Sequence, residues 1–177
     1  MNLPSYYLIQ NDERISQRIR LISQSGKYAS FAEMPPVQVW NIEAPANTEY
    51  TDWLTLAGMQ LLSDRMKHIL SKYNVTALFK MIYLIGKDGS SHSYWLPHIP
   101  QPDVLSEESE YYAHDHTIKH LVLDSAKVKG QHLFSIPNVR ELYTLVSMDA
   151  AESLLRRGLT GFLLKPVDMS LGEQRYE

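Results

Sequence analysis

Cysteine is absent from this chain of 177 residues, so disulfide bonds, thiolate nucleophiles and cysteine-based zinc or iron–sulfur sites are excluded. A hydrophobic run of the roughly 20 residues that cross a bilayer is also lacking; the apolar stretch at residues 77–85, for example, is interrupted by Lys80. The N-terminal region has no basic segment followed by an apolar core and a small-residue cleavage site. We therefore expect a soluble cytoplasmic protein with no membrane partner.

An excess of positive charge is missing as well. The chain has 17 Lys and Arg against 20 Asp and Glu, a formal net charge of -3. Nucleic-acid binding normally rests on clustered basic residues that neutralise phosphates, so no nucleic-acid partner is expected. The apolar fraction of 44% and charged fraction of 21% are ordinary globular values. Together with the length, they predict a single binding domain over residues 1–177, with a flexible tail after about residue 168.

The sequence contains none of the short motifs that mark common catalytic sites. It has no His-Glu-x-x-His, no Gly-x-Ser-x-Gly elbow, no glycine-rich phosphate loop and no dinucleotide fingerprint. The adjacent acids Glu107 and Glu108 stand between Ser106 and Ser109, whereas an acid–base pair needs one carboxyl in an apolar pocket to raise its pKa. We predict a protein that is not an enzyme and uses no cofactor.

Three histidines support an alternative in which the chain is a metal-dependent enzyme. His114 and His116 would point to one face of a strand, with Asp115 opposite and His120 nearby. Catalytic zinc sites need a third well-placed ligand and a general base, and neither is evident. Solvated or hydrogen-bonded surface histidines are the simpler interpretation.

Local patterns predict an α+β fold with a mixed or antiparallel sheet and a few short helices. Ile15, Ile19 and Ile22 have helical spacing, and a strand is expected around Trp40, where Val37, Val39 and Ile42 alternate with polar residues. A hairpin is expected from residues 79–85 and 94–96, and three prolines predict a loop at residues 97–106. Further extended segments are expected at residues 6–9, 118–123 and 133–136.

A weak internal repeat appears when residues 61–79 are laid over residues 145–163. Each copy predicts a strand, a helix and a strand. Ser63 and Ser147 stand where an N-cap oxygen is needed, and Asn74 and Gly158 stand where a left-handed residue ends a helix. Two related strand-helix-strand units are therefore predicted, with chance similarity between two common units as the alternative.

The charge pattern marks one segment for binding. Residues 88–118 contain no Lys or Arg, although they include six acidic residues and four Tyr or Trp residues. Aromatic side chains provide contact area with little loss of entropy, and charge of one sign steers a partner of the opposite sign. The alternative is a solvated loop whose aromatic residues pack beneath it.

The C-terminal third resembles a known family. Residues 121–124 (Leu-Val-Leu-Asp), Gly130 and residues 132–136 (His-Leu-Phe-Ser-Ile) are similar to the strand, Leu-Asp, turn and Phe-strand pattern of a bacterial immunity protein family encoded beside polymorphic toxins. Residues 143–147, the following helix and residues 158–162 (Gly-Leu-Thr-Gly-Phe) match that family's closing pattern, and the Leu62-Ser63 unit resembles its upstream counterpart. These are scaffold motifs, so they transfer no binding residue.

The resemblance implies an antitoxin that acts in bacterial competition: a small cytoplasmic protein that covers the active site of a cognate toxin domain. Toxins that act on anionic substrates, such as ADP-ribosyltransferases and nucleases, fit an acidic inhibitor surface. An adaptor subunit of a secretion or phage-like assembly is a further alternative. The expected toxin-binding residues are acidic or aromatic: Trp95, Asp103, Glu107, Glu108, Glu110, Tyr111 and Tyr112.

Overall fold

A computed structural model describes residues 5–15, 18–114, 117–136 and 143–170. The elements are β1 (Tyr6–Asn11), β2 (Arg20–Gln24), β3 (Val37–Glu43), β4 (Trp53–Leu56), β5 (Met59–Leu62), α1 (Asp64–Leu70), β6 (Leu78–Gly86), β7 (Ser91–His98), β8 (Glu110–Tyr111), β9 (Ile118–His120), β10 (Val122–Asp124), β11 (Leu133–Ser135), β12 (Thr144–Ser147), α2 (Met148–Arg156), β13 (Phe162–Pro166) and β14 (Asp168–Ser170). No helix in these ranges is long and apolar enough to span a bilayer.

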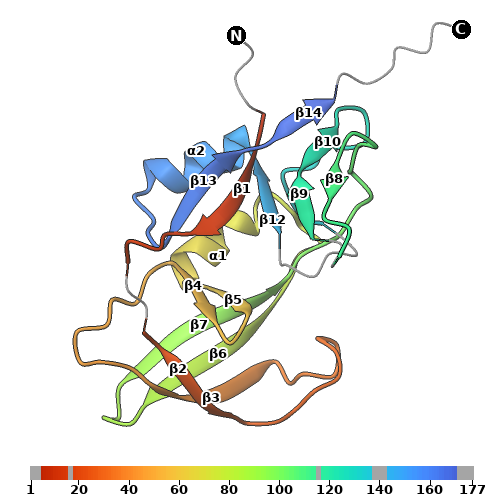
Figure 1. Ribbon diagram of the computed structural model, residues 1–177. Helices are drawn as coiled ribbons and strands as arrows, with labels where there is room; N and C mark the ends of the chain where they lie inside the picture. The colour runs from red at the N-terminus through yellow and green to blue at the C-terminus, as the bar shows by residue number, and fades with distance from the viewer. Residues whose placement is uncertain (1–4, 16–17, 115–116, 137–142, 171–177) are drawn as a thin grey trace, which may run out of the picture.

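Two sheets make up most of the fold. A six-stranded sheet has the order β2-β3-β6-β7-β5-β4, and a four-stranded sheet has the order β11-β12-β1-β13. Both contain antiparallel pairs, and β3 pairs with β6 in parallel. Figure 1 shows the six-stranded sheet in the lower half of the molecule and the four-stranded sheet with α2 in the upper half. The predicted α+β class, with a mixed sheet and two short helices, is confirmed.

The two predicted strand-helix-strand units are present and share one topology. The first is β5-α1-β6 and the second is β12-α2-β13. In each unit a third strand lies between the two strands and is antiparallel to both: β7 in the first unit and β1 in the second. The outer strands of each unit are therefore parallel, and a helix joins them, as parallel strands require.

The helix ends follow the predicted capping residues in three of four cases. Ser63 Oγ accepts from Met66 N at 3.1 Å, and Ser147 Oγ accepts from Ala150 N at 3.4 Å. Gly158 has the expected left-handed backbone, with φ of 60°. The prediction for Asn74 is wrong, because α1 already ends at Leu70 and the Asn74 side chain donates to Leu133 O instead.

A buried carboxylate joins the two units. Asp52 is 7% exposed; its Oδ1 accepts from Ser63 Oγ at 2.5 Å and its Oδ2 from Thr160 N at 3.0 Å. Trp53 N donates to Thr160 O at 3.1 Å. Gly161 has φ of 96°, and a Cβ there would overlap Trp53 O and Thr51. The Gly-Leu-Thr-Gly stretch thus brings the second unit against the strand that precedes the first.

Three apolar clusters fill the molecule. One lies between the helices and includes Met66, Leu70 and Leu154. A second covers the opposite face of the four-stranded sheet, where Leu8 and Phe134 meet Val104 and Leu123. A third, around Trp40 and Ile82, packs on one face of the six-stranded sheet.

Two local predictions are wrong. Residues 20–24 form strand β2 rather than the end of a helix, and Ile22 lies at an irregularity in its pairing with β3. β-branched residues such as Ile favour strands, and pairing with β3 satisfies the backbone of this segment. Strand β7 extends through Pro97, which is tolerated because β5 pairs with β7 only at Trp95, leaving an open edge beyond it.

The predicted strand around Trp40 is confirmed as β3. The strand buries Gln38, Trp40 and Ile42, while Val37 and Val39 point to solvent. Burial of the large Trp40 side chain, whose Nε1 donates to Gln38 Oε1 at 3.1 Å, sets the orientation of the strand.

Candidate partner-binding surface

Residues 103–112, here called the acidic segment, lie against the second apolar cluster. Val104 is fully buried, and Asp124 N donates to its carbonyl oxygen at 2.9 Å. Leu105 forms an isolated bridge with Leu123. The buried Val104 side chain and the backbone contacts with residues 123 and 124 thus hold the segment against the protein surface.

A fixed turn presents Glu107 and Glu108. Ser109 N donates to Ser106 O at 3.1 Å, which closes the turn, and Ser106 N donates to Val122 O at 3.0 Å. The Ser109 hydroxyl donates to Val122 O at 2.8 Å and accepts from Val122 N at 3.1 Å. Both glutamates are exposed at the corner of this turn, and the two flanking serines hold the corner in place.

The other two predicted acids have cationic partners within the chain. Asp103 Oδ2 lies 3.1 Å from Lys127 Nζ, and Glu110 Oε2 lies 2.6 Å from Lys119 Nζ. The hydrogen bond from Lys119 lowers the pKa of Glu110, and the hydrogen bond to Asp103 raises the pKa of Lys127. Sequence reasoning missed both lysines because they lie beyond the base-free stretch and fold back onto it. Among the described residues, Glu107 and Glu108 have no ion-pair partner.

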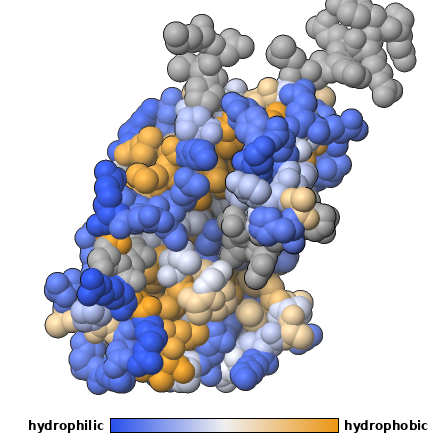
Figure 2. Space-filling model, in the orientation of Figure 1, coloured by the Kyte–Doolittle hydropathy of each residue, from blue (hydrophilic) through white to orange (hydrophobic). Residues whose placement is uncertain are grey.

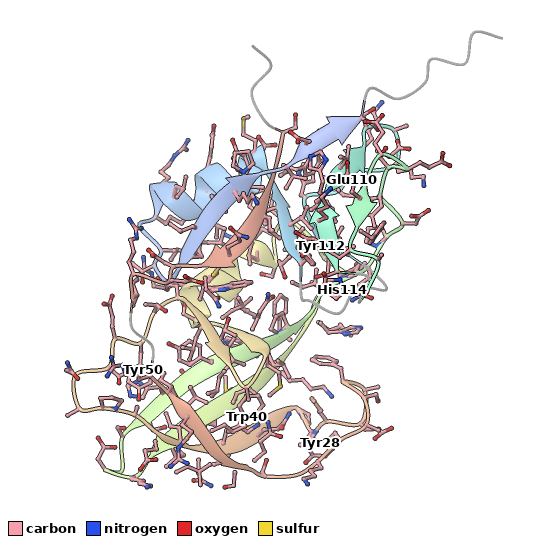
Figure 3. The ribbon with its side chains drawn as sticks, in the orientation of Figure 1. Tyr28, Trp40, Tyr50, Glu110, Tyr112 and His114 are labelled. Atoms are coloured by element: carbon pink, nitrogen blue, oxygen red, sulfur yellow. The ribbon has the colours of Figure 1, made fainter. Side chains whose placement is uncertain are left out.

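Two exposed tyrosines continue the segment. Tyr111 is 44% exposed and Tyr112 is 46% exposed. Tyr112 N donates to Thr117 O at 2.9 Å, and the Tyr112 ring lies 5.8 Å from the His114 ring, centroid to centroid. Figure 3 shows Glu110, Tyr112 and His114 following one another along β8 and the turn after it. In Figure 2 the surface over β8 to β10 is mainly hydrophilic.

Trp95 belongs to a different surface. It lies on β7 opposite Met81 and Leu62 and packs against the helix cluster. Its Nε1 donates to Asp64 Oδ1 at 3.1 Å, and Lys67 Nζ lies 4.5 Å from the centroid of its ring system. The other six predicted residues are therefore brought together, whereas Trp95 contacts α1.

The metal hypothesis concerns residues that are only partly described. His114 is exposed, while Asp115 and His116 lie outside the described residues. His120 Nε2 lies 2.8 Å from Asp168 Oδ2, which joins β9 to β14. Within the described parts of the chain, no group of three His, Asp or Glu side chains is placed to hold a metal ion.

A cleft of about 760 Å³ lies between β1 and the β4–β5 hairpin, lined in part by Gln10, Asn11, Gln60 and Leu163. Asp12, one of two carboxylates that line it, is paired with Arg14 at 2.7 Å, and the hydrogen bond from Arg14 lowers the pKa of Asp12. This ion pair keeps Asp12 ionised. Asp12 is therefore unsuited to act as a general acid, because a general acid must carry a proton.

Comparison with known proteins places these features in a family context. A family model described as "Immunity protein family (Imm11)" matches residues 2–169. No curated protein matches the chain.

Proposed function

Because the chain belongs to the immunity protein family Imm11, we propose that it binds a cognate bacterial toxin domain and neutralises it by covering the toxin's active site. Inhibition by coverage requires a stable scaffold and a complementary surface, and it requires no catalytic group on the inhibitor. The acidic segment is the surface that we assign to this contact.

The observation that supports this assignment is the fixed turn with Glu107 and Glu108. Holding a charged group in its bound geometry before association reduces the entropy lost on binding. Ser106 and Ser109 supply that order through three hydrogen bonds with Val122 and one within the turn. The neighbouring Tyr111 and Tyr112 add exposed aromatic area, which is enriched at binding hot spots.

The charge of the segment favours a toxin with a cationic active site. Enzymes that bind nucleic acids or nicotinamide dinucleotides must hold anionic phosphates, so an ADP-ribosyltransferase or a nuclease fits best. Glu107 and Glu108 would occupy positions of the substrate phosphates. The proposal includes a cytoplasmic location, because an antitoxin that protects its producer must meet the toxin where the toxin acts.

The decisive experiment is co-expression with the toxin encoded by the neighbouring gene. The wild-type chain is expected to restore growth, and the variant Glu107→Lys with Glu108→Lys is expected to lose this protection. In a direct titration with a catalytically inactive toxin domain, the double variant should bind at least about 100-fold more weakly, since two attractive charges become repulsive.

A matched control has the same change in net charge elsewhere. Glu13 and Glu49 are exposed and lie outside the segment, so Glu13→Lys with Glu49→Lys should bind like the wild type. Asp103→Asn and Glu110→Gln should each weaken binding less than Glu107→Gln or Glu108→Gln, because their charges are already paired. Equal affinities for the wild type and the Glu107/Glu108 double variant would rule out this surface, while rescue by the wild type would still support the immunity function.

A further inference from the structure

A small pocket lies where the two large sheets meet, and its walls come from both of them. Leu96 lines it from β7, Met59 from β5 and Ser135 from β11. The loop between β2 and β3 closes one side with Phe31 and Met34. The volume is about 240 Å³, which is below the roughly 300–1,000 Å³ of sites for drug-sized ligands. The pocket therefore has the size for one side chain rather than for a nucleotide.

One polar group in the pocket lacks a partner. Ser135 is 8% exposed, and its backbone N donates to Pro100 O at 2.9 Å. Within the described parts of the chain, its hydroxyl has no hydrogen-bond partner. The strand register places Ser135 opposite Thr144 on β12, and Thr144 lines the same pocket. Because a buried hydroxyl without a partner is costly, its place in the pocket points to a ligand that supplies one.

The other walls of the pocket are mainly apolar. Leu96 and Ile99 are each 7% exposed, and Met34 and Met59 add flexible side chains that adapt to a ligand. Among the described residues that line the pocket, none is Lys, Arg, Asp or Glu. A charged side chain of a partner would lose its hydration there without gaining an ion pair. An aliphatic side chain would leave the Ser135 hydroxyl unpaired, whereas an aromatic ring with a hydroxyl matches both kinds of wall.

Lys80 fixes the wall formed by Phe31 and Met34. Its Nζ donates to Phe31 O at 2.5 Å and also to Met34 O. The same atom lies 4.7 Å from the centroid of the Phe31 ring. On β7, the His98 ring stacks on the Phe31 ring with 4.9 Å between centroids. The wall is thus held in place before a partner arrives, which lowers the entropy lost on binding.

The pocket is next to the acidic segment. Gln101 lines the pocket, and Asp103 begins the segment two residues later, a separation of at most about 7 Å along an extended chain. Figure 1 shows the chain running from the end of β7 into β8. A standard interface covers about 800 Å² per partner, which is roughly 30 Å across. One partner can therefore contact the pocket and the acidic segment together.

We propose that this pocket receives a tyrosine side chain of the toxin, which anchors the contact made by the acidic segment. This inference rests on the proposed function, because it takes the toxin as the partner. A tyrosine ring fills the apolar part of the pocket, and its hydroxyl pairs with that of Ser135. Aromatic side chains in well-packed pockets are typical hot spots of protein–protein interfaces.

The compound p-cresol, which has the structure of a tyrosine side chain, tests the pocket without any toxin. In an NMR titration of the purified chain it should shift the amide signals of Leu96, Ile99 and Ser135, with a Kd on the order of 1–10 mM. Toluene should bind about fivefold more weakly, because it cannot pair with the Ser135 hydroxyl. Ser135→Ala should bind p-cresol about fivefold more weakly than the wild type does, and should bind toluene no more weakly.

Ser93→Ala is the matched control, because Ser93 is exposed on β7 and lies outside the pocket. It should bind p-cresol like the wild type. Three results would each overturn the proposal: no shift of these amide signals at about 20 mM p-cresol, equal p-cresol affinities for the wild type and a natively folded Ser135→Ala, or tighter binding of indole than of p-cresol.

Titration with the catalytically inactive toxin domain separates this proposal from the proposed function. Ser135→Ala should bind the toxin about fivefold more weakly than the wild type, and Ser93→Ala should bind it equally well. Equal toxin affinities for the wild type and Ser135→Ala would overturn the tyrosine anchor and leave the immunity function standing. A wild type that does not bind the toxin would overturn the proposed function, and with it the toxin as the source of the tyrosine.

Discussion

Replacement of Asp52 should reveal how strongly the two strand-helix-strand units depend on each other. The Asp52 carboxylate accepts from Ser63 Oγ at 2.5 Å and from Thr160 N at 3.0 Å, while Arg65 lies 3.9 Å away. Hydrogen bonds to a charged group each contribute about 1.5–3 kcal/mol. Asp52→Ala removes both bonds, so we expect it to lower the free energy of unfolding by about 3 kcal/mol. Asp52→Asn retains one acceptor oxygen and should lower it by about 1.5 kcal/mol.

Urea denaturation followed by circular dichroism measures these differences. Asp103→Asn is the matched control, because its side chain is 80% exposed and its pairing with Lys127 should contribute less than about 1 kcal/mol. Ser63→Ala should couple to Asp52→Ala by about 1 kcal/mol in a double-mutant cycle, since the two residues share a bond. A loss below about 1 kcal/mol for Asp52→Ala would refute the view that this carboxylate joins the units.

Two further perturbations test the scaffold. Gly161→Ala should lower the free energy of unfolding by about 3 kcal/mol or more, because the backbone is left-handed and the new Cβ would overlap Trp53 O. Gly158→Ala, with open space around the new Cβ, should lower it by only about 1 kcal/mol. Equal decreases for the two variants in urea denaturation would contradict this reasoning. Hydrogen bonds from Arg20 and then Lys87 lower the pKa of Glu43 from 4.5 to about 2. A lowered folded-state pKa gives stability that is present above the unfolded pKa and lost as the pH falls towards the folded one. The wild type should therefore be more stable than Glu43→Gln at pH 7, and this difference in stability should disappear as the pH falls from 4.5 to about 2. A stability difference that is constant with pH would argue against the pairing of Glu43 with Arg20 and Lys87.

Local sequence patterns are sufficient to predict features that depend only on residues close in the sequence, such as the starts of the helices. Ser63 and Ser147 were predictable as caps because a side-chain oxygen acts on an amide three residues along the chain. The orientation of β3 was not predictable in this way. Alternation predicts a strand here, but burial of Trp40 between distant strands decides which face turns inward. The pattern shows a period of two, while the choice of face depends on contacts that are remote in sequence.

The same distinction applies to the acidic segment, which we propose as the toxin-binding surface. The base-free stretch is a fact of sequence, and it predicts four carboxylates acting together. In three dimensions Lys119 and Lys127 reach back to Glu110 and Asp103, so two of the four charges are balanced within the molecule. Glu107 and Glu108, which form no ion pair within the described parts of the chain, lie at the turn fixed by hydrogen bonds to β10. If the acidic segment binds a toxin as we propose, a cationic toxin site would meet two adjacent acidic side chains on a turn with a fixed backbone. This is a narrower target than a diffuse acidic loop and can select one toxin among several of similar charge.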